Sequence, residues 1–494
     1  MRTRKQALAA AFLAALLPVF AGGCSLAPKY VQPQPPLPGE WLTGGAAVSQ
    51  PGATAQDWRQ IITDAPMKRI VELALANNRN LRVSLLNVEK AQAQHQIARA
   101  DLFPKIDATA DSSSVRTPAS LSSTGKPYTS RSYSVGLGFS AFELDLFGRL
   151  RSLKEQALEQ YLSTEAAAKS VELTLVAEVS TAYLTLVADR EHLTLAQEVL
   201  ETELASYELT KYRFEHGVDN ELTLSQAQTT VDNARISVAQ YAAQVTADET
   251  TLSVLVGMPL GPELLPAKTL AEVSPLTSVP AGLPSEVLMR RPDVLSAEHT
   301  LKAANANIGA ARAMHFPIIS LTGSYGTSSN AINGLFQSGS QAWSFVPQIT
   351  LPIFHAGAIS AGVKSAEADR NISVAQYEKS VQTAFKEVSD ALAQGASLTT
   401  QVEAQTSLAK ATAKSYELST LRYENGVDSY MTKLDSQRSN VSAQQGLISA
   451  RLSRQTNLLT LYKALGGGWN GEDEPESTTL NKPAAVLEAK AQVK

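Results

Sequence analysis

Four segments of the chain alternate between apolar and small polar residues, the pattern of a β-strand with two different faces. These strands are expected at about 105–114, 131–144, 317–327 and 341–354. In the second strand the apolar face would carry Tyr133, Val135, Leu137, Phe139 and Ala141. Strands of about ten residues with one apolar and one small polar face are typical of membrane β-barrels, and a soluble half-buried sheet is the alternative.

The segments between paired strands are polar and long. Residues 112–131 and 327–341 are rich in Ser, Thr and Gly, which predicts loops of the outward-facing kind. Four strands cannot close a barrel, since about eight are needed even for an interior filled by side chains. Unpaired strand edges are costly in lipid. If the strands span a membrane, several chains must therefore share one barrel, and the sequence predicts an obligate oligomer.

Two stretches nearly without proline, 148–256 and 357–465, predict pairs of long helices. The first is interrupted at Gly217, and the second is expected to break at Gly395 and Gly426. A helix of about 36 residues would rise about 54 Å, which favours coiled-coil packing. The faces are rich in Ala, Ser, Gln and Leu, with only thin apolar seams. This suits a hollow wall wetted on both sides, with a soluble helical bundle as the alternative.

The chain contains an internal duplication. Residues 208–219 and 417–428 are identical at seven of twelve positions, and RADLFP at 99–104 matches RAMHFP at 312–317. Each half would begin with a helix, 80–102 or 293–314, and continue through two strands and two long helices. We therefore assign residues 57–270 to a first repeat and residues 271–466 to a second, each far longer than a solenoid repeat.

The N-terminus has the pattern of an export signal. Basic residues precede a short apolar run and the small residues before Cys24, so residues 1–23 are expected to be a signal peptide. Cys24 is the only cysteine, which excludes an internal disulfide and favours lipidation of its thiol over an incidental cysteine. Residues 24–56 are proline-rich at 28–38 and predict an extended, lipid-anchored tether.

Composition argues against an enzyme or a nucleic-acid-binding protein. The net charge is -4, and no basic stripe is present. The six histidines are scattered without metal-ligand spacing, and no nucleophile motif or phosphate loop occurs. We expect no catalytic residue, no metal and no cofactor. Residues 467–494 are expected to be a disordered tail.

Four motifs together resemble one protein family. They are CSLAP at 24–28, LPS at 283–285 with RRPD at 290–293, RYENGVD at 422–428 and LDSQR at 434–438. With them the chain resembles the outer-membrane efflux proteins of the TolC and OprM type, in the NodT-like lipoprotein branch that serves resistance-nodulation-division pumps. The resemblance extends from Cys24 to about Leu465.

The resemblance implies an α+β membrane protein that works as a homotrimer. Four strands per chain would form a twelve-stranded outer-membrane barrel, and the helices a long periplasmic barrel narrowing at its tip. A periplasmic adaptor and an inner-membrane pump would dock there, with the pump supplying the energy for export of small molecules. The channel would lie in the outer membrane of a Gram-negative bacterium, anchored by lipid.

The two Gly-Val-Asp turns would lie at that tip. They comprise Gly217, Val218, Asp219, Gly426, Val427 and Asp428. Glycine permits the left-handed backbone that often ends a helix, and an aspartate after it can cap the next helix. Helix capping is therefore the structural interpretation of the two aspartates. Contact with the adaptor is the functional one.

The family resemblance also suggests a periplasmic gate at Met431, Asp435 and Arg438. These residues share one helical face through their i, i+4 and i+3 spacing. Three symmetric carboxylates near an axis would repel one another unless bound to cations or paired, so they could regulate opening. The alternative is a solvated Asp435–Arg438 surface pair. The first repeat has Leu222 and Gln226 at the equivalent positions, so only the second repeat carries the acid.

Two other functions fit parts of the pattern. A duct for secreted polypeptides would share the fold, and a lipid-anchored periplasmic scaffold without a pore would share the helices. The alternating strands argue against the scaffold, whereas the lipidation motif and the LPS and RRPD motifs favour pump-linked efflux.

Overall fold

The computed structural model describes residues 25–34, 38, 41, 58–266, 269–273 and 288–467. The expected signal peptide, Cys24, most of the expected tether and the tail beyond Gly467 lie outside the described residues. The chain divides into two compact units. Unit 1 comprises Met1–Gln34, Asn87–Glu165 and Ser296–Glu378, and unit 2 comprises Pro35–Leu86, Ala166–Leu295 and Lys379–Lys494.

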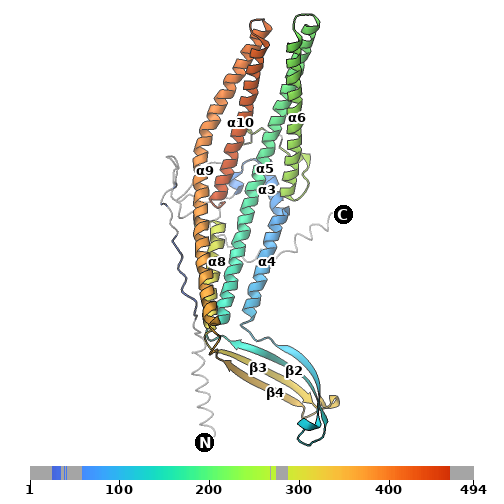
Figure 1. The fold of residues 1–494 in the computed structure, drawn as a ribbon, viewed down its shortest axis with the longest axis vertical. Coiled ribbons are helices and arrows are strands. Elements are labelled where there is room, and N and C mark those ends of the chain that lie inside the picture. Colours follow the sequence, from blue (N-terminus) through green and yellow to red (C-terminus); the bar gives the residue numbers. More distant parts are fainter. Residues whose placement is uncertain are drawn as a thin grey trace. The chain divides into compact units, whose positions relative to one another are not determined.

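The described residues form helices and strands in the order that the two repeats predict (Figure 1). The α-helices are α2 (Trp58–Ile61), α3 (Ala65–Asn77), α4 (Arg79–Ala100), α5 (Arg149–Glu215), α6 (Glu221–Val256), α8 (Pro292–Ala313), α9 (Ala358–Glu424) and α10 (Tyr430–Ala464). The strands are β1 (Asp107–Thr117), β2 (Tyr128–Leu144), β3 (Ile318–Ser329) and β4 (Gln341–Thr350). Three short 3₁₀ helices occur at Ala119–Leu121, Pro262–Leu264 and Ile332–Gly334.

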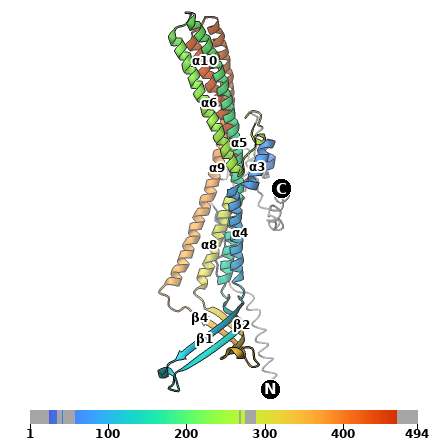
Figure 2. The same cartoon turned by 90° about the vertical axis from the view of Figure 1, so that its right-hand side faces the viewer.

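Unit 1 contains one antiparallel sheet in the order β1-β2-β3-β4 (Figure 2). Its register aligns the apolar residues into cross-strand rows, one of which joins Leu137, Tyr325 and Trp343. The next row joins Phe139, Gly323 and Phe345. Most of these side chains are exposed within the chain, with Trp343 at 76 % and Tyr325 at 63 %, and Phe139 is half-buried over Gly323. The opposite face carries small polar residues and a hydrogen bond between the Ser324 and Ser344 hydroxyls at 2.8 Å.

The apolar face predicted for β2 was wrong beyond Phe139, because the strand contains a β-bulge there. Phe139 pairs with Gly323, whereas the next apolar pair is Phe142 with Leu321, so the register shifts between Phe139 and Phe142. Ala141, which was expected in the apolar row, lies in this bulge with φ 52°. The inserted residue moves the apolar face from odd to even positions, and Phe142 and Leu144 continue it.

The first two strands are longer than predicted. Residues 115–117 and 128–130 were expected in the polar loop between the strands, but they extend the β1–β2 ladder as far as Thr117 opposite Tyr128. Ser and Thr alternate well in a strand whose faces are both exposed within the chain, so polarity alone misplaced the strand ends.

Unit 2 has an apolar core on α3, α5 and α6 and the end of α10. Val179, Tyr183, Leu186, Leu252 and Leu459 are all buried there. Part of α5 is apolar and long enough to cross a membrane by composition, with mean hydropathy 1.5, yet 56 % of that segment is buried inside the protein. The apolar run therefore marks the core helix of this unit rather than a membrane span.

The long helices begin and end close to the predicted bounds, but α9 does not break at Gly395. It continues for 67 residues from Ala358 to Glu424. A single glycine weakens a helix without ending it, because its amide still donates the i→i−4 hydrogen bond. The predicted breaks at Gly217 and Gly426 do occur, as turns between α5 and α6 and between α9 and α10.

Candidate functional site: the helix tips and the α10 face

The proposed gate residues lie on one exposed face of α10. Met431, Asp435 and Arg438 are exposed, whereas Lys433, Leu434 and Gln437 of the same helix are buried. The Asp435–Arg438 surface pair is not formed, since neither residue has an ion-pair partner among the described residues. Asp435 is thus available to a group outside its own chain.

The buried face of α10 packs on the α5–α6 hairpin within unit 2. Tyr430 and Leu434 form a small apolar cluster with Ala227 of α6. The Lys433 ammonium donates to the Ser206 hydroxyl at 3.4 Å and lies 5.5 Å from the Tyr423 ring centroid. These contacts fix the rotation of α10 about its axis and so decide which face stays exposed.

A buried acid accompanies this lysine. Glu203 of α5 is 5 % exposed and accepts a hydrogen bond from the Thr230 hydroxyl at 2.8 Å. Burial raises the pKa of Glu203, opposed by the Thr230 hydrogen bond and by the charge of Lys433. Burial also lowers the pKa of Lys433, opposed by the charge of Glu203. The two charges compensate each other in a part of the site that the sequence analysis did not identify, since their partners come from three helices.

The two helix turns repeat one local structure at neighbouring positions in unit 2 (Figures 1 and 2). Gly217 and Gly426 both have φ 72°, the left-handed backbone that glycine adopts without strain. In each turn the valine amide donates to an arginine carbonyl at 2.8 Å, from Val218 to Arg213 and from Val427 to Arg422. The duplication has therefore preserved backbone geometry as well as sequence.

The structure corrects the capping interpretation of the turn aspartates. The N-cap of α6 is Asn220, and that of α10 is Ser429, each accepting from an amide three residues later. Asp219 and Asp428 instead pair with Arg213 and Arg422. The Arg422 guanidinium donates to both carboxylate oxygens of Asp428, at 2.6 and 3.0 Å. The Arg213 guanidinium lies 3.0 Å from an Asp219 carboxylate oxygen, but this contact lacks hydrogen-bond geometry.

The valines of the turns point outward. Val218 is 65 % exposed and Val427 62 % exposed. Each turn is held by its arginine–aspartate pair, so its valine is presented on a backbone of fixed shape. Rigid exposed apolar side chains of this kind lose little conformational entropy on binding a partner.

Two carboxyl groups approach each other between α5 and α6. Burial raises the pKa of Asp248 from 3.8 to about 6. A hydrogen bond with Asp189 and the charge of Asp189 contribute to the same shift. The Gln244 side-chain amide donates to Asp248 at 3.0 Å and partly opposes the shift. The folded protein therefore retains this proton at pH values where the unfolded chain has lost it.

This pair predicts a pH-dependent stability that Asp248→Asn should remove. Because the folded pKa is raised, the stabilising contribution is complete below about pH 4 and is lost as pH rises through about 6. We expect the variant to match wild type near pH 4 and to exceed it by about 1 kcal/mol at pH 8, after allowance for solvent screening. Thermal unfolding across this pH range measures the difference.

Asp232→Asn is the matched control for that measurement. Asp232 is also an acid of α6, but it is 53 % exposed and pairs with Arg235 only at the surface. Its replacement should shift stability by less than about 0.5 kcal/mol at either pH. If the stability of wild type and of Asp248→Asn depended on pH in the same way, the raised pKa of Asp248 would be contradicted.

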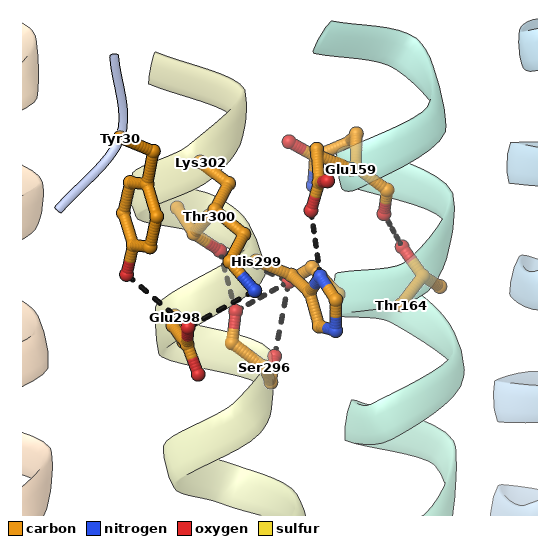
Figure 3. A network of polar contacts seen from close by, with 10 residues as sticks. Tyr30, Glu159, Thr164, Ser296, Glu298, His299, Thr300 and Lys302 are labelled. Atoms are coloured by element: carbon orange, nitrogen blue, oxygen red, sulfur yellow. Dashed lines mark hydrogen bonds and ion pairs between the residues drawn. The ribbon is translucent and has the colours of Figure 1, made fainter. Parts of the chain in front are cut away.

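The N-terminal segment 25–34 is extended and lies on α8 and α9 within unit 1. Figure 3 shows the Tyr30 hydroxyl pointing to Glu298, to which it donates at 3.2 Å, with the Lys302 ammonium near the Tyr30 ring. The Asn305 side-chain amide donates to the Pro28 carbonyl at 2.7 Å. A Cβ at Gly309 would lie 2.8 Å from Ala27. This part of the expected tether is therefore held against the helices.

Beside that segment, polar side chains join α8 to α5. The His299 ring nitrogen Nδ1 lies 2.6 Å from a Glu159 carboxylate oxygen (Figure 3). The Ser163 hydroxyl contacts Ser296 and Thr300 at 2.9 to 3.0 Å. No group of three or more His, Cys, Asp or Glu side chains suited to a metal occurs among the residues that the structure describes.

Comparison with known proteins places this arrangement in a family. The model of the outer membrane efflux protein family matches residues 70–258 and 283–467. The chain is 47 % identical over 453 residues to the probable efflux pump outer membrane protein TtgC of Pseudomonas putida, covering 91 % of this chain and 93 % of that protein. It is 41 % identical over 471 residues to outer membrane protein OprJ of Pseudomonas aeruginosa, covering 95 % and 97 %.

Solved structures agree with the sequence relatives. A membrane protein from Pseudomonas aeruginosa superposes with a TM-score of 0.86 at 41 % identity, covering 91 % of this chain and 99 % of that one. The open state of the Neisseria gonorrhoeae MtrE outer membrane channel gives 0.82 at 37 % identity, covering 90 % and 99 %. The predicted fold and the predicted outer-membrane location, with helices extending into the periplasm, are confirmed. The chain belongs to the outer membrane efflux protein family and serves as an outer-membrane efflux channel.

Proposed function

We propose that three copies of this chain form one passive, gated duct, with four strands from each chain in a twelve-stranded barrel. The observation that carries this proposal is the sheet of unit 1, whose apolar rows and two outer edges have no partner within the described chain. In lipid every backbone group must be paired, so β1 and β4 need strands from other copies. Trp343, Ile349 and Phe345 would then face the acyl chains.

The periplasmic end of the duct would be regulated at α10, and its tip would meet a periplasmic adaptor and an inner-membrane pump. Asp435 supports the first part, because it is exposed and unpaired within the described residues while the opposite face of α10 is buried. The outward Val218 and Val427 support the second, since their rigid turns offer apolar contacts to a partner. Energy would come from the pump, and the channel would need no cofactor.

The cargo would be small molecules rather than polypeptides. Relatives of 44 to 47 % identity carry names that refer to toluene, solvent or antibiotic efflux. The channel itself would select weakly, because the described faces of its long helices are rich in small polar side chains. The substrate would therefore follow the pump that the channel serves.

Single-channel recording tests the duct. Purified full-length protein in planar bilayers should give discrete conductance steps, and its mass in detergent should be that of three chains. A monomer with no conductance, in a bilayer where a control porin conducts, would contradict the duct and favour a periplasmic scaffold. Passage of unfolded polypeptide but not of small solutes would favour the secretion duct.

We further propose that Cys24 is lipidated. Ala27 packs at Gly309, and the segment runs toward the β3 end of α8. From Gly309 the helix rises about 6 Å to its end at Ala313, and β3 begins at Ile318. The described segment thus leads toward the end of α8 that adjoins the strands, which supports a membrane anchor upstream of it.

Replacing Cys24 with serine should abolish this anchor. We expect the variant to keep its signal peptide, which adds more mass than the missing acyl groups remove, so the intact mass should increase. Mass spectrometry of membrane-extracted protein measures both. A wild-type mass equal to that of the unmodified chain cleaved before residue 24 would contradict lipidation, whatever the variant does.

A further inference from the structure

The α9–α10 hairpin contains interior glycines, whereas α5 and α6 contain none. They are Gly362 and Gly395 in α9 and Gly446 in α10. Glycine destabilises a helix interior relative to alanine, because it loses more backbone freedom when the helix forms. Gly362 has open space around its Cβ position, but Gly395 and Gly446 do not.

At Gly395 an amide from α10 reaches the backbone of α9. The Asn457 side-chain amide is 5 % exposed and donates to the carbonyl oxygen of Ala391 at 2.9 Å. Ala391 lies one turn before Gly395, so its carbonyl points along the helix toward the glycine. A Cβ at Gly395 would lie 3.2 Å from the Asn457 amide nitrogen, closer than side chains ordinarily pack.

At Gly446 the same arrangement occurs in the opposite direction. The Gln405 side-chain amide of α9 donates to the carbonyl oxygen of Ala443 in α10 at 3.1 Å. A Cβ at Gly446 would overlap with the Gln405 amide nitrogen. In the first repeat the positions equivalent to Asn457 and Gln405, 209 residues earlier, are Asp248 and Ala196, so α5 and α6 lack both bonds.

We propose that Asn457 and Gln405 are positioning residues that join α9 and α10 into one stiff hairpin, so that the gate face of α10 moves only together with α9. The proposal rests on the gate proposed above. The two bonds are 14 residues apart on each helix, from Ala391 to Gln405 and from Ala443 to Asn457, which is about 21 Å.

Two features make these bonds effective constraints. Each acceptor is a backbone carbonyl, which cannot swing away as a side chain can, so each bond fixes the axial register of the helices. Two bonds at separate levels also oppose pivoting about either one alone. Between the Ala443 bond and Arg438 there is little more than one helical turn, so a displacement of α9 would reach the gate face without bending of α10.

A double-mutant cycle tests the two bonds in the full-length protein. Gly395→Ala and Gly446→Ala are made in wild type and in the Asn457→Ala, Gln405→Ala background, and thermal unfolding is measured. In wild type we expect each alanine to lower the Tm by about 2 °C, and in the background lacking the amides to raise it by about as much. Gly362→Ala, which meets nothing, should raise the Tm equally in both.

A second readout detects stiffness itself. Spin labels at Thr399→Cys and Ser449→Cys, exposed positions at one level of α9 and α10, should give a narrow distance distribution that broadens when Asn457 and Gln405 are alanine. In bilayers the same double variant should flicker between conductance levels about fivefold more often, the factor expected for one hydrogen bond.

An equal rise of Tm for Gly395→Ala and Gly446→Ala in both backgrounds would overturn the proposal, as would an unchanged distance distribution. The unfolding and spin-label measurements do not require conductance. A failure of the gate, seen as an Asp435→Ala channel identical to wild type, is therefore distinguishable from a failure of the stiff hairpin.

Discussion

Replacing Asp435 with alanine is expected to convert a mostly closed channel into a mostly open one. We expect the open probability in planar bilayers to rise at least about tenfold, which corresponds to about 1.4 kcal/mol. The reason lies in the exposure of Asp435 on α10, where it has no ion-pair partner among the described residues. In a trimer its carboxylate would therefore be held by cations or by groups of other chains.

The closed state would depend on those bridging interactions. Three carboxylates around one axis repel one another, and a cation or a neighbouring Arg438 converts that repulsion into attraction. Alanine removes the attraction without touching Leu434 or Lys433, which hold α10 against α5 and α6. The helix should stay in place while its exposed face loses its means of closing the axis.

Two variants separate charge from other effects. Asp435→Asn keeps the size of the side chain and should open the channel nearly as much as alanine. Ser439→Ala alters an exposed position of the same helix outside the proposed gate and should leave the open probability unchanged. If Asp435→Ala and Ser439→Ala behaved alike, Asp435 would have no part in closure, although the channel itself would stand.

The sequence identified the elements well where periodicity governs them. Alternation located the four strands, and the absence of proline located α5, α6, α9 and α10. It misplaced Ala141, because a bulge adds one residue without any local signal in an alternating segment. The prediction of a helix break at Gly395 was wrong, because this glycine makes room for the Asn457 side-chain amide of another helix, and that contact has no local sequence signal.

Some residues of the candidate site could also be predicted from the sequence, and others could not. Met431, Asp435 and Arg438 were proposed from the family resemblance and from their helical spacing, and the structure leaves all three exposed on α10. Glu203 and Lys433 were missed, because they lie 230 residues apart in the sequence and only packing brings their helices together. The capping assignment of Asp219 and Asp428 was wrong by one residue, because an arginine six residues earlier competes for each carboxylate.

A second large effect is expected at Arg291, which the sequence marked only as part of the RRPD motif. Its side chain is 6 % exposed and meets three helices of unit 2. It donates to Asp293 of α8 and to Glu387 of α9, both at 2.8 Å. It also donates to the carbonyl oxygen of Ala464 at the end of α10, at 2.7 Å. The charge therefore stabilises a helix C-terminus as well as two carboxylates.

Arg291→Ala should destabilise the protein by about 3 kcal/mol, since it leaves a cavity and an unpaired buried carbonyl. Lysine should recover only part of this loss, because one ammonium group cannot reach three acceptors in the geometry of a guanidinium. The cost should fall short of that for a fully buried ion pair, because Asp293 and Glu387 are 38 % and 44 % exposed and stay hydrated when the arginine is gone.

Arg290→Ala supplies the matched control, because Arg290 is the adjacent residue of the same type and is exposed. Thermal unfolding followed by circular dichroism in detergent should give a clearly lower Tm for Arg291→Ala and a Tm within about 1 °C of wild type for Arg290→Ala. Equal shifts for the two would mean that the buried contacts contribute no more than surface charge. A loss confined to Arg291→Ala, partly restored by lysine, would show that this one side chain fastens the end of α10 to α9, the hairpin that carries the proposed gate residues.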